Sequence, residues 1–174
     1  MKIKDTQLTL SVLFEGYFNQ RLRVQRKVSR ETVSTYRDAL KLLVTFVSRK
    51  SGISPVQMKI TDIDRDMVLA FLDYLEEDRG NCIRTRNARL AAIHSFFRYA
   101  AYQDPRAMAV AGRVLDIPLK RTTTPILGYL TPEEEDDLLG VVDLETRLGR
   151  RDYTLLLFMA RTGARVSEAV GINA

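Results

Sequence analysis

Apolar residues recur three or four positions apart through the first hundred residues, and this spacing is the feature that most limits the fold. Residues at that spacing share one face of a helix. No stretch alternates with the period of two that a half-buried strand requires. Helices are predicted over residues 6–26, 30–49, 65–79 and 83–102. The first part of the chain is therefore predicted to be an all-α bundle.

Each predicted helix has an apolar stripe that we expect in the core. The stripes are Leu10, Leu13, Phe14, Tyr17, Phe18 and Leu22; Val33, Tyr36, Leu40, Leu43, Val44 and Val47; Met67, Val68, Phe71, Leu72 and Leu75; and Leu90, Ile93, Phe97 and Ala100. Ser29 and Asp64 precede two of the helices and are expected N-caps.

The pattern changes after the fourth helix. Residues 103–130 lose the helical period and contain three prolines, which predicts a linker. Thr131, Pro132 and Glu134 then form a helix-start signature, with a cap, a proline in the first turn and a capping box. A loop over 143–150 and a buried helix over 151–160 are expected to follow.

Charge is divided unevenly along the chain. Residues 1–110 contain 19 Lys and Arg against 12 Asp and Glu, whereas residues 131–174 contain 5 against 9. A basic first part suggests a polyanion such as DNA or RNA, and a basic solvated surface is the alternative.

The chain has one cysteine, no signal peptide and no apolar run of the ~20 residues that span a membrane. A cytoplasmic protein is expected.

Two helices are candidates for contact with a nucleic acid. The fourth begins with Arg84, Arg86, Asn87 and Arg89 among small alanines, which suits a helix that enters a DNA groove. An arginine-rich solvent face explains the same pattern equally well. In the second helix, Arg30, Ser34, Arg37 and Lys41 share a face. The outer face of the third helix is acidic and is not expected to meet a nucleic acid.

Arg165 lies at a corner between two helices near the end of the sequence. Gly163 is suited to ending the apolar helix before it, and Arg165 follows at the start of a short second helix. A guanidinium near a helix start can bind an anion. An ion pair with Glu168, three residues on, is the structural alternative.

The stretch from Thr162 to Ala169 resembles the Thr-Gly-x-Arg-x-x-Glu-Leu signature of the tyrosine recombinases, the phage integrase family. Three upstream stretches share the resemblance: 35–40, 85–90 with 96–100, and Asp104-Pro105. It implies a four-helix SAM-like core-binding domain over residues 1–103, an interdomain linker over 104–130, and the first helices of an incomplete catalytic domain over 131–174.

The resemblance also implies roles for individual residues. Arg165 would hold the scissile phosphate. The second and fourth helices would face double-stranded DNA and the linker would cross its backbone, which gives as candidate contacts Arg37, Lys41, Arg84, Arg86, Asn87, Arg89, Lys120 and Arg121. No cofactor is implied, and no residues have metal-ligand spacing.

The family's pattern continues after its first arginine with a lysine, a His-x-x-Arg pair, a further His or Trp, and a tyrosine nucleophile. None of the seven tyrosines follows Arg165, and the single histidine, His94, has Phe97 three residues later. The chain alone is therefore expected to bind recombination sites without cutting DNA, as a truncated recombinase. Self-association through the apolar residues 155–159, or contact with a full-length recombinase, is a further expectation.

Two alternatives remain at this point. The chain could be a non-catalytic DNA-binding protein that competes with a full-length recombinase or recruits one. It could also be an unrelated helical interaction module whose basic face is incidental.

Overall fold

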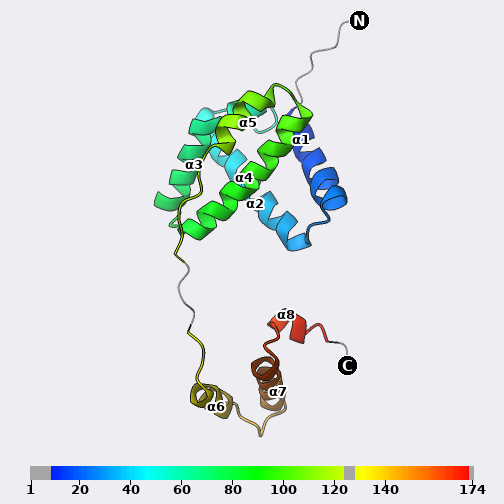
Figure 1. The fold of residues 1–174 in the computed structure, drawn as a ribbon, viewed down its shortest axis with the longest axis vertical. Helices are drawn as coiled ribbons and strands as arrows, with labels where there is room; N and C mark the ends of the chain where they lie inside the picture. The colour runs from blue at the N-terminus through cyan, green and yellow to red at the C-terminus, as the bar shows by residue number, and fades with distance from the viewer. Residues whose placement is uncertain (1–8, 124–127, 173–174) are drawn as a thin grey trace, which may run out of the picture. The chain divides into compact units, whose positions relative to one another are not determined.

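The computed structural model describes residues 9–123 and 128–172, which divide into two compact units at Thr123 and Thr124 (Figure 1). All regular structure in the described residues is helical, which confirms the predicted all-α class. Residues 6–8 of the first predicted helix and 124–127 of the predicted linker lie outside the described residues.

The described part of the first unit contains the four predicted helices, a short 3-10 helix and one further α-helix. Its elements are α1 (Leu10–Gly16), η1 (Tyr17–Gln25), α2 (Arg30–Ser51), η2 (Ile60–Asp62), α3 (Arg65–Glu77), α4 (Ile83–Gln103) and α5 (Ala107–Leu115). Both predicted caps are present. Ser29 Oγ accepts a hydrogen bond from Thr32 N at 3.2 Å, and Asp64 Oδ1 accepts one from Met67 N at 2.8 Å.

The first predicted helix changes its winding halfway along. α1 continues without a break into η1, which is a π-helix with i to i+5 hydrogen bonds. The fully buried residues show why, because Tyr17 and Leu22 are five positions apart and both have no exposed surface. An α-helical register would place Arg21 nearer the buried face, whereas the wider winding leaves Arg21 exposed.

α4 supplies the middle of the core. Its predicted stripe, Leu90, Ile93, Phe97 and Ala100, is fully buried. It packs with the stripes of α2 and α3, of which Leu43, Val47, Phe71 and Leu75 are buried as predicted. Gly16 of α1 comes so close to α4 that an added Cβ would overlap the Tyr99 hydroxyl. The bundle is thus assembled around α4.

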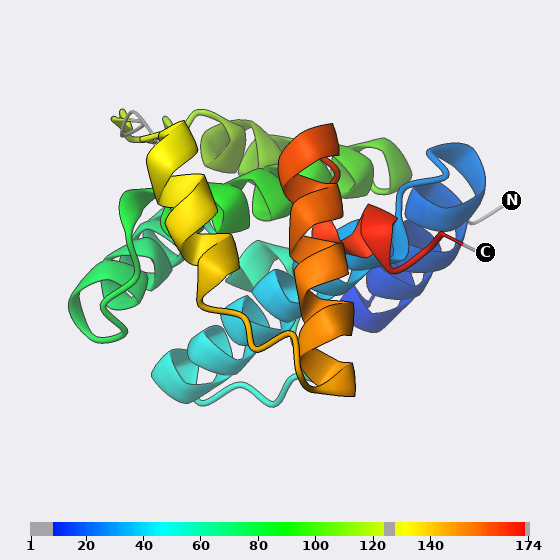
Figure 2. The ribbon, with the colours of Figure 1, turned by 90° about the horizontal axis from the view of Figure 1, so that it is seen from below.

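The predicted linker contains a helix that the sequence analysis missed. α5 lies beside α4 (Figures 1 and 2), and Ala107, Ala111, Val114 and Ile117 are buried at helical spacing. The prolines had indicated a linker without helices. Pro105 precedes α5 and Pro118 follows it, so neither interrupts its hydrogen bonds.

The second unit contains α6 (Pro132–Gly140), α7 (Arg147–Thr162) and α8 (Val166–Ala169). α6 and α7 lie side by side (Figure 2). The predicted capping box is present, with Glu134 N donating to Thr131 Oγ1 at 3.2 Å and Thr131 N donating to Glu134 Oε2 at 2.8 Å. Gly163 ends α7 in the left-handed conformation, with φ of 67°.

Two expectations for α7 differ from the structure. The helix begins four residues earlier than predicted, because Thr146 caps it by accepting a hydrogen bond from Gly149 N at 2.9 Å. Its apolar residues are also only partly covered within this unit. Leu155, Leu156 and Leu157 are half-buried, and Phe158 is 38% exposed.

We predict that Ile117→Ala lowers the free energy of unfolding by about 2–5 kcal/mol, because the side chain is 1% exposed in the core. Urea unfolding followed by circular dichroism measures this change. The matched control is Leu119→Ala, since Leu119 is 55% exposed and lies two residues on. An equally small effect of both substitutions would mean that the chain after α4 is a linker without a place in the core.

Candidate nucleic-acid interface

The first turns of α2 and α4 lie at the same edge of the first unit (Figure 1). The chain also leaves the unit there, because Lys120 is hydrogen-bonded to Asn87 in the second turn of α4. Four arginines on these segments have exposed side chains: Arg30, Arg37, Arg84 and Arg121. We call this the basic edge.

α2 presents its predicted polar face to solvent. Arg30, Ser34, Arg37 and Lys41 are all exposed. The guanidinium carbon of Arg37 lies 5.8 Å from the centre of the Phe18 ring, a cation–π distance that limits the side chain's freedom. These side chains form no ion pair within residues 9–123 and 128–172, so their charge is available to a ligand.

Arg84 lies at the beginning of α4, on a helix face whose next side chains are small. Arg84, Ala88 and Ala91 are exposed and lie on one face, so another backbone can approach closely. The first turn of α4 contains no acidic residue. Its free N–H groups and the positive end of its dipole therefore favour an anion at this edge.

Arg89 is only half exposed, and its surroundings disfavour its charge. One terminal nitrogen is buried without a hydrogen-bond partner in the described part of the chain. Burial lowers the pKa of the guanidinium, and the nearby charge of Arg79 lowers it further. Two cations side by side without a carboxylate partner attract an anion. Sequence reasoning missed Arg79 because it follows α3 and belongs to no periodic pattern.

Arg86 lies inside the unit. Its residue is 4% exposed, and Nε lies 3.2 Å from Glu76 Oε1 of α3. Nη1 donates to Asn87 Oδ1 at 3.2 Å and to the Pro118 carbonyl at 3.5 Å. The predicted solvent-facing position is wrong for this residue, because its carboxylate partner holds it inward.

Asn87 and Lys120 belong to the same network. Asn87 Nδ2 donates to the Lys120 carbonyl at 2.7 Å, and Lys120 N donates to Asn87 Oδ1 at 3.1 Å. Lys120 Nζ donates to the two Glu76 oxygens at 2.7 and 3.0 Å. The hydrogen bond from Lys120 is the largest cause of a lowered pKa for Glu76. Together with Arg86 these residues form a clasp that holds residues 118–120 against α3 and α4.

The clasp changes the roles expected for the linker residues. Lys120 and Asn87 are engaged within the unit, whereas Arg121, the next residue, is exposed. DNA contact by Arg86, Asn87 or Lys120 would require the clasp to open, whereas the exposed Arg121 needs no such change. The predicted contacts thus separate into an exposed group and a structural group.

Arg165 belongs to the second unit. Its side chain is 82% exposed, and Nη1 lies 3.3 Å from Glu168 Oε1. Arg165 N also donates to Glu168 Oε2 at 2.8 Å. The ion pair that was the structural alternative is therefore present, and the phosphate-binding role stays a prediction.

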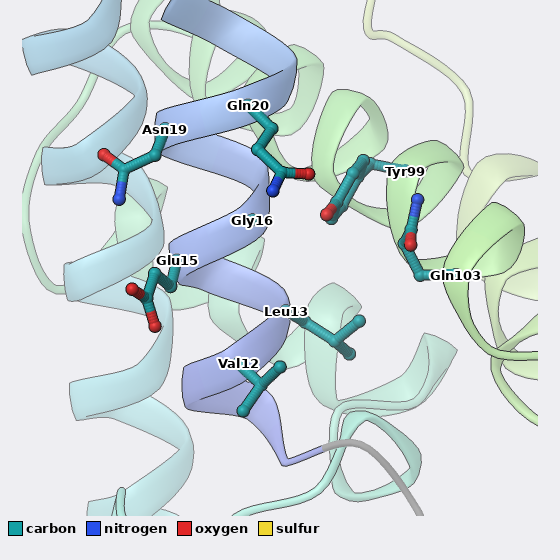
Figure 3. Close-up of a pocket in the computed structure, with 8 residues that line it drawn as sticks. All are labelled: Val12, Leu13, Glu15, Gly16, Asn19, Gln20, Tyr99 and Gln103. Atoms are coloured by element: carbon teal, nitrogen blue, oxygen red, sulfur yellow. The ribbon is translucent and has the colours of Figure 1, made fainter.

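A hollow elsewhere in the first unit differs in charge from the basic edge. It measures about 340 Å³ and lies between α1, η1 and α4 (Figure 3). Its polar lining consists of Glu15, Asn19, Gln20, Tyr99 and Gln103, without a lysine or arginine. A polyanion would find no positive charge there.

The described residues contain neither a cluster of metal-binding side chains nor a membrane-spanning helix. Within 9–123 and 128–172, no group of three or more His, Cys, Asp and Glu side chains could hold a metal ion. The helices of the same ranges are too short or too polar to cross a membrane.

We predict that Asn87→Ala accelerates tryptic cleavage after Lys120 about tenfold. Two neutral hydrogen bonds contribute ~1–3 kcal/mol together, and cleavage requires local opening of this segment. Mass spectrometry of the first products measures the rate. Asn19→Ala is the control, since it removes an exposed amide elsewhere. Equal rates in Asn87→Ala and the unaltered chain would exclude a holding role for Asn87.

Known proteins similar to this chain include one domain family and several recombinases. The family described as "Phage integrase, N-terminal SAM-like domain" matches residues 15–104. "Putative integrase/recombinase y4rD" of Sinorhizobium fredii is 50% identical over 167 residues, which cover 96% of this chain and 59% of that protein. "Tyrosine recombinase XerC" of Oceanobacillus iheyensis is 30% identical over 161 residues, which cover 92% of this chain and 50% of that protein.

The chain thus spans about half the length of the curated relatives it matches. No solved structure matches it. The matched residues 15–104 include α2, α3 and α4, the helices that build the basic edge and its support. By this match and the recombinase relatives, the chain belongs to the phage integrase family of tyrosine recombinases.

Proposed function

We propose that this chain is the DNA-binding portion of a site-specific tyrosine recombinase, and that the basic edge of the first unit contacts the duplex. The observation that carries the proposal is the set of exposed arginines on the first turns of α2 and α4 that form no ion pair with any residue the structure describes. Arginines in this state bind phosphates with little loss of existing contacts.

The proposed contacts fall into three groups. Arg37 and Lys41 of α2 and Arg84 of α4 extend from helix faces that can lie along a groove. Arg89 and its neighbour Arg79 offer positive charge that lacks a carboxylate, which suits a phosphate. Arg121 then provides a contact where the chain leaves the unit. α3 is excluded, because Asp73, Glu77 and Asp78 are exposed on it and after it.

Arg165 is the residue of this chain that matches the family's catalytic arginine. We propose that a phosphate replaces Glu168 as its partner when DNA is bound. Breaking the exposed ion pair of Arg165 with Glu168 costs little free energy, since such a pair contributes about 0–1 kcal/mol. Recombination by the whole protein is part of this proposal.

We predict that labelled duplex DNA binds the chain with an affinity that falls steeply with salt, and that Arg84→Ala/Arg89→Ala weakens it. Each lost phosphate contact reduces the slope of log K against log salt by about 0.9. Fluorescence anisotropy across a salt series measures both quantities.

The matched control is Arg49→Ala/Lys50→Ala, which removes the same charge at the other end of α2. If the salt slope decreases more in Arg84→Ala/Arg89→Ala than in the control, the result supports a contact at the beginning of α4. No binding by the unaltered chain at low salt would reject DNA binding and favour a helical interaction module.

A further inference from the structure

A groove of about 530 Å³ separates the end of η1 from the beginning of α2. Its lining consists of Arg23, Val28, Arg30, Val33, Ser34 and Arg37. Three of these six residues are arginines, and none is a carboxylate. Arg30, Ser34 and Arg37 belong to the face of α2 that was expected to meet a nucleic acid, and the groove adds Arg23 of η1 to the basic edge.

The arginines reach the groove from both of its sides. Arg23 comes from the last turn of η1, whereas Arg30 and Arg37 come from the first two turns of α2. No ion pair to Arg23 or Arg30 is found within the described ranges. Three guanidinium groups without carboxylates repel one another, and an anion between them would remove that repulsion.

The neighbouring carboxylate of Glu31 forms no ion pair with these arginines in the described residues. Glu31 is next to Arg30, but its pKa is lowered first by a backbone hydrogen bond at its own residue and then by Ser29, with the charge of Arg30 a smaller cause. Arg30 itself is in the first helical position, where the dipole disfavours a cation.

The chain reversal that builds the groove is itself strained. Lys27, between η1 and α2, has φ of 46°, which is left-handed and costs a residue with a side chain roughly 1–2 kcal/mol. Val28 N closes the reversal by donating to the Leu22 carbonyl at 3.2 Å. This conformation brings Arg23 opposite Arg30, an arrangement that persists at a cost in strain and in charge repulsion.

The remaining lining suits a phosphate more than an organic anion of large apolar area. Val33 is 6% exposed and is the buried residue of the lining. Ser34 adds a hydroxyl donor. Arg37 is restrained by the Phe18 ring at 5.8 Å, so part of the site is pre-ordered.

We propose that the groove between η1 and α2 binds a phosphodiester of the DNA backbone through Arg23, Arg30 and Arg37, with Ser34 as an additional donor. The inference rests on the proposed DNA binding and deepens it. It adds a backbone clamp at the α2 end of the basic edge, separate from the contacts of α4. Such a contact fixes the position of the unit on DNA and reads no bases.

The test compares Arg23→Ala/Arg30→Ala with Arg49→Ala/Lys50→Ala by anisotropy of labelled duplexes of two unrelated sequences. The four residues are exposed, and equal thermal unfolding of the variants confirms intact folding. We expect the groove variant to lose about 0.9 of the salt slope for each phosphate contact, on both duplexes alike, and the control to lose less.

Equal losses in the two variants would overturn the groove site, and the Arg84→Ala/Arg89→Ala result would still stand for the proposed function. If the unaltered chain binds no duplex, the arginine Nε–H signals are followed by NMR during a titration with inorganic phosphate. Saturable shifts confined to Arg23, Arg30 and Arg37 would support a phosphate site in the groove. Absence of such shifts would reject it.

Discussion

Burial of one face of α4 is the interaction on which the first unit depends. Leu90, Ile93 and Phe97 have no exposed surface, and the helices on either side contact them. The same helix carries polar residues at its beginning, where the core ends. Burial therefore fixes the rotation of α4, and this rotation decides which of its arginines reach solvent. Arg84 faces outward and Arg86 faces inward, two residues apart on one helix.

Ion pairs near the beginning of α4 separate the basic residues of this region into two groups. Glu76 holds Arg86 and Lys120, so two cations near α4 are already paired. Arg84, Arg89 and Arg121 remain without carboxylates in the described residues. A single glutamate thus divides the basic residues into those that close the fold and those that are available to a polyanion, and it fixes the place where the chain leaves the unit.

Periodicity predicted α2, α3 and α4 well, because each buries a stripe that a 3.6-residue period reveals. It missed α5, since proline content was given more weight than the spacing of Ala107, Ala111 and Val114. The π-helical winding of η1 was not recognised, because Leu22 lies four residues after Phe18 and an ordinary α-helix also accounts for that spacing. For the site, composition could locate basic segments. It could not show that a glutamate on another helix removes Arg86 from the surface, because that depends on tertiary packing.

Hydrogen exchange of the first unit, with and without duplex DNA, tests the central claim most directly. The account predicts added protection over residues 23–41, 83–91 and 118–123, and unchanged exchange in α3. Protection concentrated on α3, or none at all under conditions where the duplex is bound, would contradict a DNA-facing edge built from the first turns of α2 and α4.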